Sequence, residues 1–106
     1  MEKMSPHALE QIAAYFKALS DPTRLQILRL LGEGQYNVGE LAQRCNFSSA
    51  NISRHLSILN RHGLITRQSQ GTHVFYQLTD ESTYALCEMV CQIIERQISV
   101  QKQAFA

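Results

Sequence analysis

Two cysteines, Cys87 and Cys91, are spaced four residues apart in a stretch with the apolar periodicity of a helix. That spacing places both sulfurs on one helix face, with their Cβ atoms about 6 Å apart. Thiolates at this separation are ligands for soft metal ions and metalloids, of which trivalent arsenic is the leading candidate. If two copies of this helix pair about a two-fold axis, the thiols of both copies converge, and Cys45 is a candidate third ligand.

Two other interpretations of the cysteines stay open. Reduced cysteines are often small hydrophobic side chains buried in a helix seam, and accessible thiols can undergo reversible oxidation or persulfide chemistry. Three cysteines cannot all pair within one chain, which favours reduced thiols over a disulfide framework. No histidine lies close to a cysteine in the sequence, so a mixed Cys/His metal site would have to be assembled in three dimensions.

Basic and hydrogen-bonding side chains gather in the middle of the chain. The net charge is only +1, yet residues 41–79 contain four arginines and no acidic residue. The same stretch is rich in Ser, Asn, Gln, Thr and His. Such a segment is typical of a surface that meets nucleic-acid phosphates, although chance clustering of polar residues gives the same composition.

Apolar spacing predicts four helices that would position this chemistry. They lie at about residues 7–19, from 22 to a stop at Gly32 or Gly34, at about 38–45 and at about 48–62. The short connection between the last two makes residues 38–62 a helix-turn-helix. In the fourth helix, apolar residues recur at i, i+4 and i+7 and are predicted to face inward: Ile52, Leu56 and Leu59. The polar residues between them, His55 included, are then predicted to lie on the exposed face.

A β-hairpin and a last helix complete the predicted architecture. Residues 64–67 and 72–78 are rich in β-branched and aromatic side chains and predict strands joined around Ser69-Gln70-Gly71. Thr79 or Asp80 is suited to cap a helix over about 80–100. We therefore predict one domain over residues 1–106, mainly α-helical with a β-hairpin wing at about 64–78, which is a winged helix-turn-helix.

The last predicted helix also indicates an oligomer. A chain of 106 residues builds a small core, and this helix is apolar over a broader arc than that core can cover. We expect it to pair with its symmetry mate, with helix 7–19 contributing, so that a homodimer forms. Because no apolar run approaches the ~18 residues of a membrane span and no secretory signal precedes the domain, we expect a cytoplasmic protein without a membrane partner.

Several separated motifs occur in one order and with consistent gaps. They are ALSDPTRLQIL at 18–28, VGELA at 38–42, SSANISRHLSIL at 48–59, GLI at 63–65 and VFYQL at 74–78. Together these motifs, over roughly residues 8–95, resemble the ArsR/SmtB family of bacterial repressors. The resemblance implies a homodimeric winged-helix repressor that binds a palindromic operator on double-stranded DNA. It also implies release by a metal, a metalloid or another inducer, or by thiol oxidation.

The resemblance and the helix phase together predict the DNA contacts. In the fourth helix they are Ser48, Ser49, Ala50, Asn51, Arg54 and His55, with Ser48 capping the helix so that backbone N–H groups can meet a phosphate. In the wing they are Arg67, Gln70, Thr72 and His73, with His73 equally consistent with a solvated loop residue. Ser53 is expected to pack against a neighbouring helix instead.

The chain departs from the best-known metal sites of that family. Where one such site has Cys-Val-Cys at the start of the third helix, this chain has Asn37-Val38-Gly39. Where another has Asp and three His on the last helix, only Asp80 remains, and the other places hold Ser82, Ile93 and Arg96. One carboxylate cannot hold zinc, so a zinc or nickel sensor of that type is not expected. Cys87, Cys91 and Cys45 remain the candidate metal or thiol switch.

Three other function classes compete with a controlled repressor. They are a constitutive or architectural DNA-binding dimer with structural cysteines, a helix-pairing module without DNA, and an enzyme. The sequence has no Gly-rich phosphate loop and no paired carboxylates in an apolar setting, and neither Cys87 nor Cys91 has a nearby histidine to act as base. An enzyme is therefore not predicted, and no cofactor is certain beyond a thiophilic ion.

Overall fold

Each of the first four helices begins where a polar side chain accepts a hydrogen bond from the first turn. Ser5 caps α1 (Pro6–Leu19), Asp21 caps α2 (Pro22–Leu31), Asn37 caps α3 (Val38–Cys45) and Ser48 caps α4 (Ser49–Arg61). The computed structural model describes residues 2–104, and side chains as far as residue 101. Residues 1, 105 and 106 of the predicted domain lie outside the described residues. The four predicted helices are thus confirmed, with starts within a residue of those expected.

The core lies where α2, α3 and α4 meet. Ile52, Leu56 and Leu59 of α4 are buried almost completely, which confirms their predicted inward orientation. They belong to one apolar cluster with Leu28 of α2 and Leu41 of α3. Burying each such side chain contributes about 1.5–3 kcal/mol. This packing fixes which side of α4 is left for solvent.

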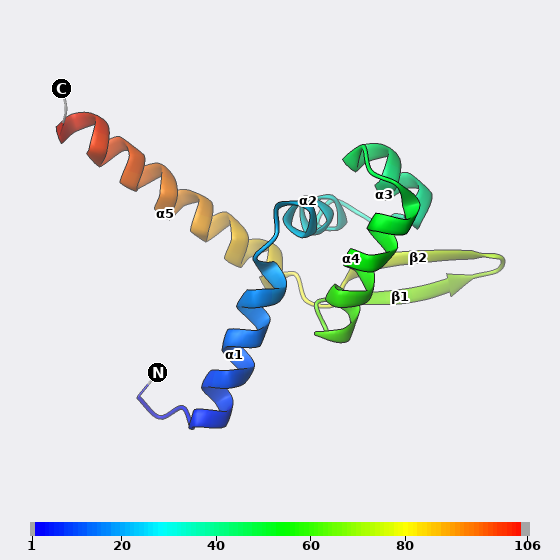
Figure 1. Cartoon of the computed structure of the whole chain (residues 1–106), viewed down its shortest axis with the longest axis horizontal. Coiled ribbons are helices and arrows are strands. Elements are labelled where there is room, and N and C mark those ends of the chain that lie inside the picture. The colour runs from blue at the N-terminus through cyan, green and yellow to red at the C-terminus, as the bar shows by residue number, and fades with distance from the viewer. Residues whose placement is uncertain (1, 105–106) are drawn as a thin grey trace.

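The wing is an antiparallel hairpin of β1 (Ile65–Gln70) and β2 (His73–Leu78) that extends away from the helices (Figure 1). The prediction ended the first strand too early, because Ser69 and Gln70 lie in β1 and Gln70 pairs with His73. Only two residues then form the turn, and Gly71 adopts a φ of 65° there. A two-residue hairpin turn needs such a left-handed residue, which glycine adopts without strain. The overall arrangement is the predicted winged helix-turn-helix.

The last helix, α5 (Ser82–Ala104), leaves the body of the molecule as an arm (Figure 1). It begins two residues later than predicted, after Asp80, whose Oδ1 accepts a hydrogen bond from the Ser82 backbone N–H at 2.8 Å. Its first turn is fastened to α1, because the Tyr15 hydroxyl and the Thr83 hydroxyl lie 2.7 Å apart in a hydrogen bond. Among the described residues, no helix combines the length and apolar character that a membrane crossing would need.

The aromatic ring of Tyr84 fastens α5 to the end of α2. A Cβ atom added to Gly32 would overlap Cδ2 of Tyr84, so the ring occupies the space that a side chain at position 32 would need. Gly32 has an ordinary helical φ of −67° and is required here for space rather than for backbone freedom. The contact between Gly32 and Tyr84 therefore holds the first turns of α5 against the end of α2.

We expect Gly32→Ala to destabilise the protein by about 1–3 kcal/mol, because the Tyr84 ring must move to admit the methyl group. Gly34→Ala is the matched control, since nothing lies within 4 Å of a Cβ at Gly34. Urea unfolding at one fixed protein concentration measures the difference. Equal stability of the two variants would contradict the packing role of Gly32. In a chain that already carries Tyr84→Ala, adding Gly32→Ala should cause no further loss of stability, because the ring that the methyl group would meet is absent.

Candidate functional site

The outward side of α4 is polar and carries basic charge. Ser49, Ala50 and Arg54 are exposed and Asn51 is half-buried, as expected of a helix whose other side packs on the core. At 100° per residue, Arg54 lies roughly opposite Ile52 around the helix. This side is therefore free to meet a large partner.

The start of α4 is exposed and suited to an anion. The Oγ of Ser48 accepts a hydrogen bond from the Asn51 backbone N–H at 3.2 Å, so the predicted capping role of Ser48 is confirmed. The first turn contains no acidic side chain. Backbone N–H groups at a helix start carry partial positive charge, which attracts phosphate.

Two sequence predictions about α4 are wrong in opposite senses. Ser53 does not pack against a neighbouring helix but is exposed beside Arg54. His55 was predicted on the exposed face, yet it is only 8% exposed. The helical phase explains the burial, because His55 lies only about 40° around the helix from the buried Leu59. Its placement as a direct base contact is thereby corrected.

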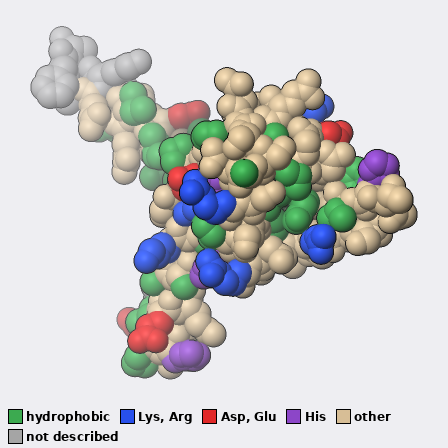
Figure 2. Space-filling model, turned by 45° about the vertical axis from the view of Figure 1, so that its right-hand side comes forward, with side chains coloured by type: hydrophobic (Ala, Val, Ile, Leu, Met, Phe, Trp, Pro, Cys, Tyr) green, Lys and Arg blue, Asp and Glu red, His purple; other side chains and the backbone are tan. Residues whose placement is uncertain are grey.

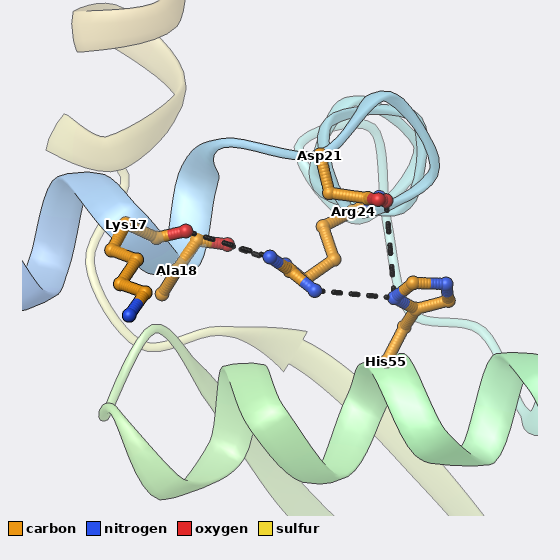
Figure 3. A network of polar contacts seen from close by, with 5 residues as sticks. All are labelled: Lys17, Ala18, Asp21, Arg24 and His55. Carbon is orange, nitrogen blue, oxygen red and sulfur yellow. Dashed lines mark hydrogen bonds and ion pairs between the residues drawn. The ribbon is translucent and has the colours of Figure 1, made fainter.

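His55 lies in a polar cluster with α2. Its Nδ1 is 3.5 Å from Nη1 of Arg24 and 3.9 Å from Oδ2 of Asp21 (Figure 3). The Arg24 backbone N–H donates to the Asp21 carboxylate, and together with the charge of the Arg24 guanidinium this holds the pKa of Asp21 below its usual range. Sequence reasoning missed Arg24, whose only sequence signal is its place in the first turn after the Asp21 cap.

The wing is braced by the loop before α3. Tyr36 and Tyr76 exchange backbone hydrogen bonds, so Tyr36 pairs with β2 in an isolated antiparallel bridge. The Gln35 side chain donates to Gln77 at 3.0 Å and accepts from Gln70 at 3.4 Å. The predicted wing contacts are all exposed: Arg67, Gln70, Thr72 and His73. The hairpin is therefore held at a set angle while its outer side chains stay accessible.

Two of the three thiols line an apolar groove. Cys87 and Cys91 face a groove of about 580 Å³ between α1, α2 and α5, together with Phe16, Leu28 and Ile94. Hydrophobic side chains remain exposed along the arm beyond it (Figure 2). Cys45 lies on α3 against the core and does not line the groove. No group of three or more His, Cys, Asp or Glu suited to a metal ion occurs among the described residues, so the chain by itself does not bring Cys45 to the other two.

The surroundings of all three thiols raise their pKa and so favour the protonated form. Burial raises the pKa of Cys45, partly offset by the charge of Arg29, and burial alone raises that of Cys87. The charge of Glu95 raises the pKa of Cys91, whose Sγ also donates to Glu95 Oε1 at 3.6 Å. Thiolates, not thiols, are the nucleophiles and metal ligands. A ligand of these sulfurs must therefore displace their protons.

Comparison with known proteins agrees with this geometry. Residues 21–67 match the model of a family described as bacterial regulatory protein, arsR family. The transcriptional activator HlyU of Vibrio cholerae is 36% identical over 90 residues, covering 85% of this chain and 80% of HlyU. The transcriptional repressor SdpR of Bacillus subtilis is 43% identical over 63 residues, covering 59% of this chain and 70% of SdpR.

Solved structures show the same fold. The homodimeric winged helix-turn-helix DNA-binding domain of a Mycobacterium bovis protein superposes with a TM-score of 0.80 at 29% identity. The match covers 92% of this chain and 94% of that domain. The order of helices and hairpin described above is therefore that of a DNA-binding domain.

We expect Glu95→Gln to increase the rate at which Cys91 is alkylated near neutral pH. Removing the Glu95 charge lowers the pKa of Cys91 toward its usual value, so more thiolate is present at a given pH. The measurement is the pH dependence of iodoacetamide reaction in a chain whose other thiols are replaced, Cys45→Ser and Cys87→Ser. Glu88→Gln is the matched control, because Glu88 is the weakest of the influences on Cys91. An identical midpoint with and without Glu95 would contradict the assignment.

Proposed function

Because the chain belongs to the ArsR family of bacterial regulatory proteins, we propose that it is a homodimeric transcriptional repressor that binds a palindromic operator in the cytoplasm. The observation that carries the proposal is the exposed polar side of α4 beside a braced wing. A helix of this kind fits the major groove, and a hairpin beside it reaches the adjoining backbone or minor groove. Both elements are held to one core, so they approach DNA as a unit.

The side chains of α4 match the hydrogen-bonding chemistry of base edges. Arginine pairs with guanine and asparagine with adenine through two hydrogen bonds, which assigns base contacts to Arg54 and Asn51. Ser49 and Ser53 are short hydroxyl donors on the same side, and Ala50 suits a thymine methyl group. Ser48 and the N–H groups after it suit a phosphate. Since His55 is buried, its role in this interface is indirect.

The wing supplies contacts that carry little sequence information. Arg67 lies on β1, while Gln70, Thr72 and His73 surround the turn. Basic and hydroxyl or amide side chains at such a tip position a domain on the sugar-phosphate backbone. The Gln35 amide bridge between Gln70 and Gln77 fixes the hairpin for that contact.

Dimerisation through α1 and α5 is supported by the hydrophobic side chains left uncovered there. Phe16 and Leu9 of α1 and Ile94 and Ile98 of α5 are each more than two-fifths exposed. Large exposed apolar side chains gathered on two helices are typical of a protein interface. The related Mycobacterium bovis domain is homodimeric. A two-fold dimer places two copies of α4 on half-sites about 34–36 Å apart, which is why the operator is expected to be palindromic.

The groove thiols are the candidate point of control. A thiophilic ligand such as trivalent arsenic that bridges Cys87 and Cys91 would sit on the surface proposed for pairing and alter the spacing of the two α4 helices. Reversible thiol oxidation or persulfide formation at the same sulfurs is the alternative. A third role, in which the cysteines only pack, is supported by the apolar lining of the groove and by the burial that raises the pKa of Cys87.

We expect Arg54→Ala and Arg67→Ala to weaken DNA binding in different ways. Arg54→Ala should cost about 1–3 kcal/mol on the operator and relax one base preference, because a base contact is lost. Arg67→Ala should weaken all duplexes alike and reduce the salt slope by about one, because a phosphate contact is lost. Fluorescence anisotropy across salt concentrations and single-base operator variants measures both. Unchanged operator affinity for Arg54→Ala would remove its assignment, and each variant is the control for the other.

The thiol proposal is tested on the DNA upstream of the protein's own gene at fixed salt. We expect trivalent arsenic to release the reduced wild type but not Cys87→Ser or Cys91→Ser, whereas Cys45→Ser should behave as wild type. Release of all four proteins would place the site elsewhere. If arsenic releases none of the four proteins from DNA, the remaining roles for the cysteines are reversible oxidation and packing. An oxidant titration of the same complexes then separates those two roles.

A further inference from the structure

The side chain of Arg24 joins three helices at one point (Figure 3). Its Nε donates to the carbonyl of Ala18 at 2.6 Å, and its Nη2 donates to that of Lys17 at 3.4 Å. Both carbonyls belong to the last turn of α1, and that of Lys17 also accepts the backbone N–H of Ser20 at 3.1 Å. Arg24 itself lies in the first turn of α2. A charged donor therefore secures the end of α1 against α2.

The same guanidinium reaches the middle of α4. Its Nη1 lies 3.5 Å from Nδ1 of His55. Because arginine only donates, Nδ1 of a neutral His55 accepts this bond and the ring proton sits on Nε2. The Asp21 carboxylate, which caps α2, faces the same Nδ1 at 3.9 Å. Cap, guanidinium and imidazole thus form one cluster.

The cluster of Asp21, Arg24 and His55 gives α4 a directional restraint that its apolar packing does not provide. Burial of Ile52, Leu56 and Leu59 holds α4 against the body, but the hydrophobic effect has no directional preference. Hydrogen bonds do have one, and they strengthen where water is largely excluded, as around His55. His55 directly follows Arg54, the side chain assigned to a base. A small rotation of α4 at His55 would shift the position of the Arg54 side chain in the DNA major groove.

We propose that Arg24 and His55 are positioning residues that couple the end of α1 to the orientation of α4, and so set operator affinity without touching a base. The inference rests on the proposed function, since it concerns how α4 meets DNA. Because α1 also carries exposed hydrophobic side chains suited to pairing, the link runs from the proposed pairing surface to the DNA-reading surface. A shift of α1 would then be transmitted to Arg54 through the side chains of Arg24 and His55.

The test compares Arg24→Gln, His55→Leu and their combination with wild type. Anisotropy titrations use the operator and a scrambled duplex across a range of salt. We expect each single variant to lose roughly tenfold in operator affinity, and the double variant to lose no more than either single one, since both break one link. Binding to the scrambled duplex and the salt slope should stay as in wild type.

Two further variants separate positioning from charge and from general packing. His55→Asn places an amide oxygen close to the position of Nδ1, where it can accept from Arg24. This variant should recover most of the operator affinity that His55→Leu loses. Lys3→Gln removes one positive charge at an exposed position before α1 and should bind as wild type. Circular dichroism melts establish that each variant is folded at the binding temperature.

The outcomes distinguish this inference from the proposed function. A wild type that binds operator and scrambled DNA alike would refute the proposed function itself. A selective wild type with unchanged Arg24→Gln and His55→Leu variants would overturn only the positioning link. Equal loss on both duplexes with a smaller salt slope would make Arg24 a phosphate contact, and variants unfolded at the binding temperature would make the pair purely structural. Either result also overturns the inference.

Discussion

Burial of one apolar side of α4 is the constraint on which the rest of the structure depends. Ile52, Leu56 and Leu59 have at most 1% of their surface exposed, and Leu28 and Leu41 belong to the same cluster. At 100° per residue, this orientation turns Arg54 outward and brings His55 to the boundary of the core. A slip of one residue would rotate every polar side chain by that angle. The presentation of α4 is therefore a consequence of its buried side.

Sequence alone predicted the elements whose signals are local. Asn37 and Ser48 accept hydrogen bonds from backbone groups three residues later, so a short stretch contains both partners. The recurrence of Ile52, Leu56 and Leu59 is equally local. The end of β1 is different, because Ser69-Gln70-Gly71 has turn-forming composition but Gln70 is held by His73 across the hairpin and by Gln35. Only the pairing partner decides where that strand stops.

In the candidate site, too, the residues with local sequence signals were predicted and those held by distant partners were not. Exposure of Arg54 and Arg67 follows from period and composition, and both were predicted. His55 was misplaced because a polar residue beside an apolar stripe is normally solvated, and its partners lie about thirty residues earlier in the chain. Nothing in the neighbourhood of His55 in the sequence reveals Asp21 or Arg24. The groove at Cys87 and Cys91 is likewise formed by helices from both ends of the chain.

The two ends of α2 have different tasks, and this relates the arm to the DNA-reading surface. At its start, Asp21 and Arg24 bind the end of α1 and the imidazole of α4. At its end, Gly32 leaves the space in which the Tyr84 ring seats α5. Between them Leu28 and its neighbours fill the core. Any pairing of α1 and α5 with a second copy therefore acts on opposite ends of one ten-residue helix, which packs directly against α4. A short rigid helix transmits such a displacement more faithfully than a loop would, because its internal hydrogen bonds resist bending.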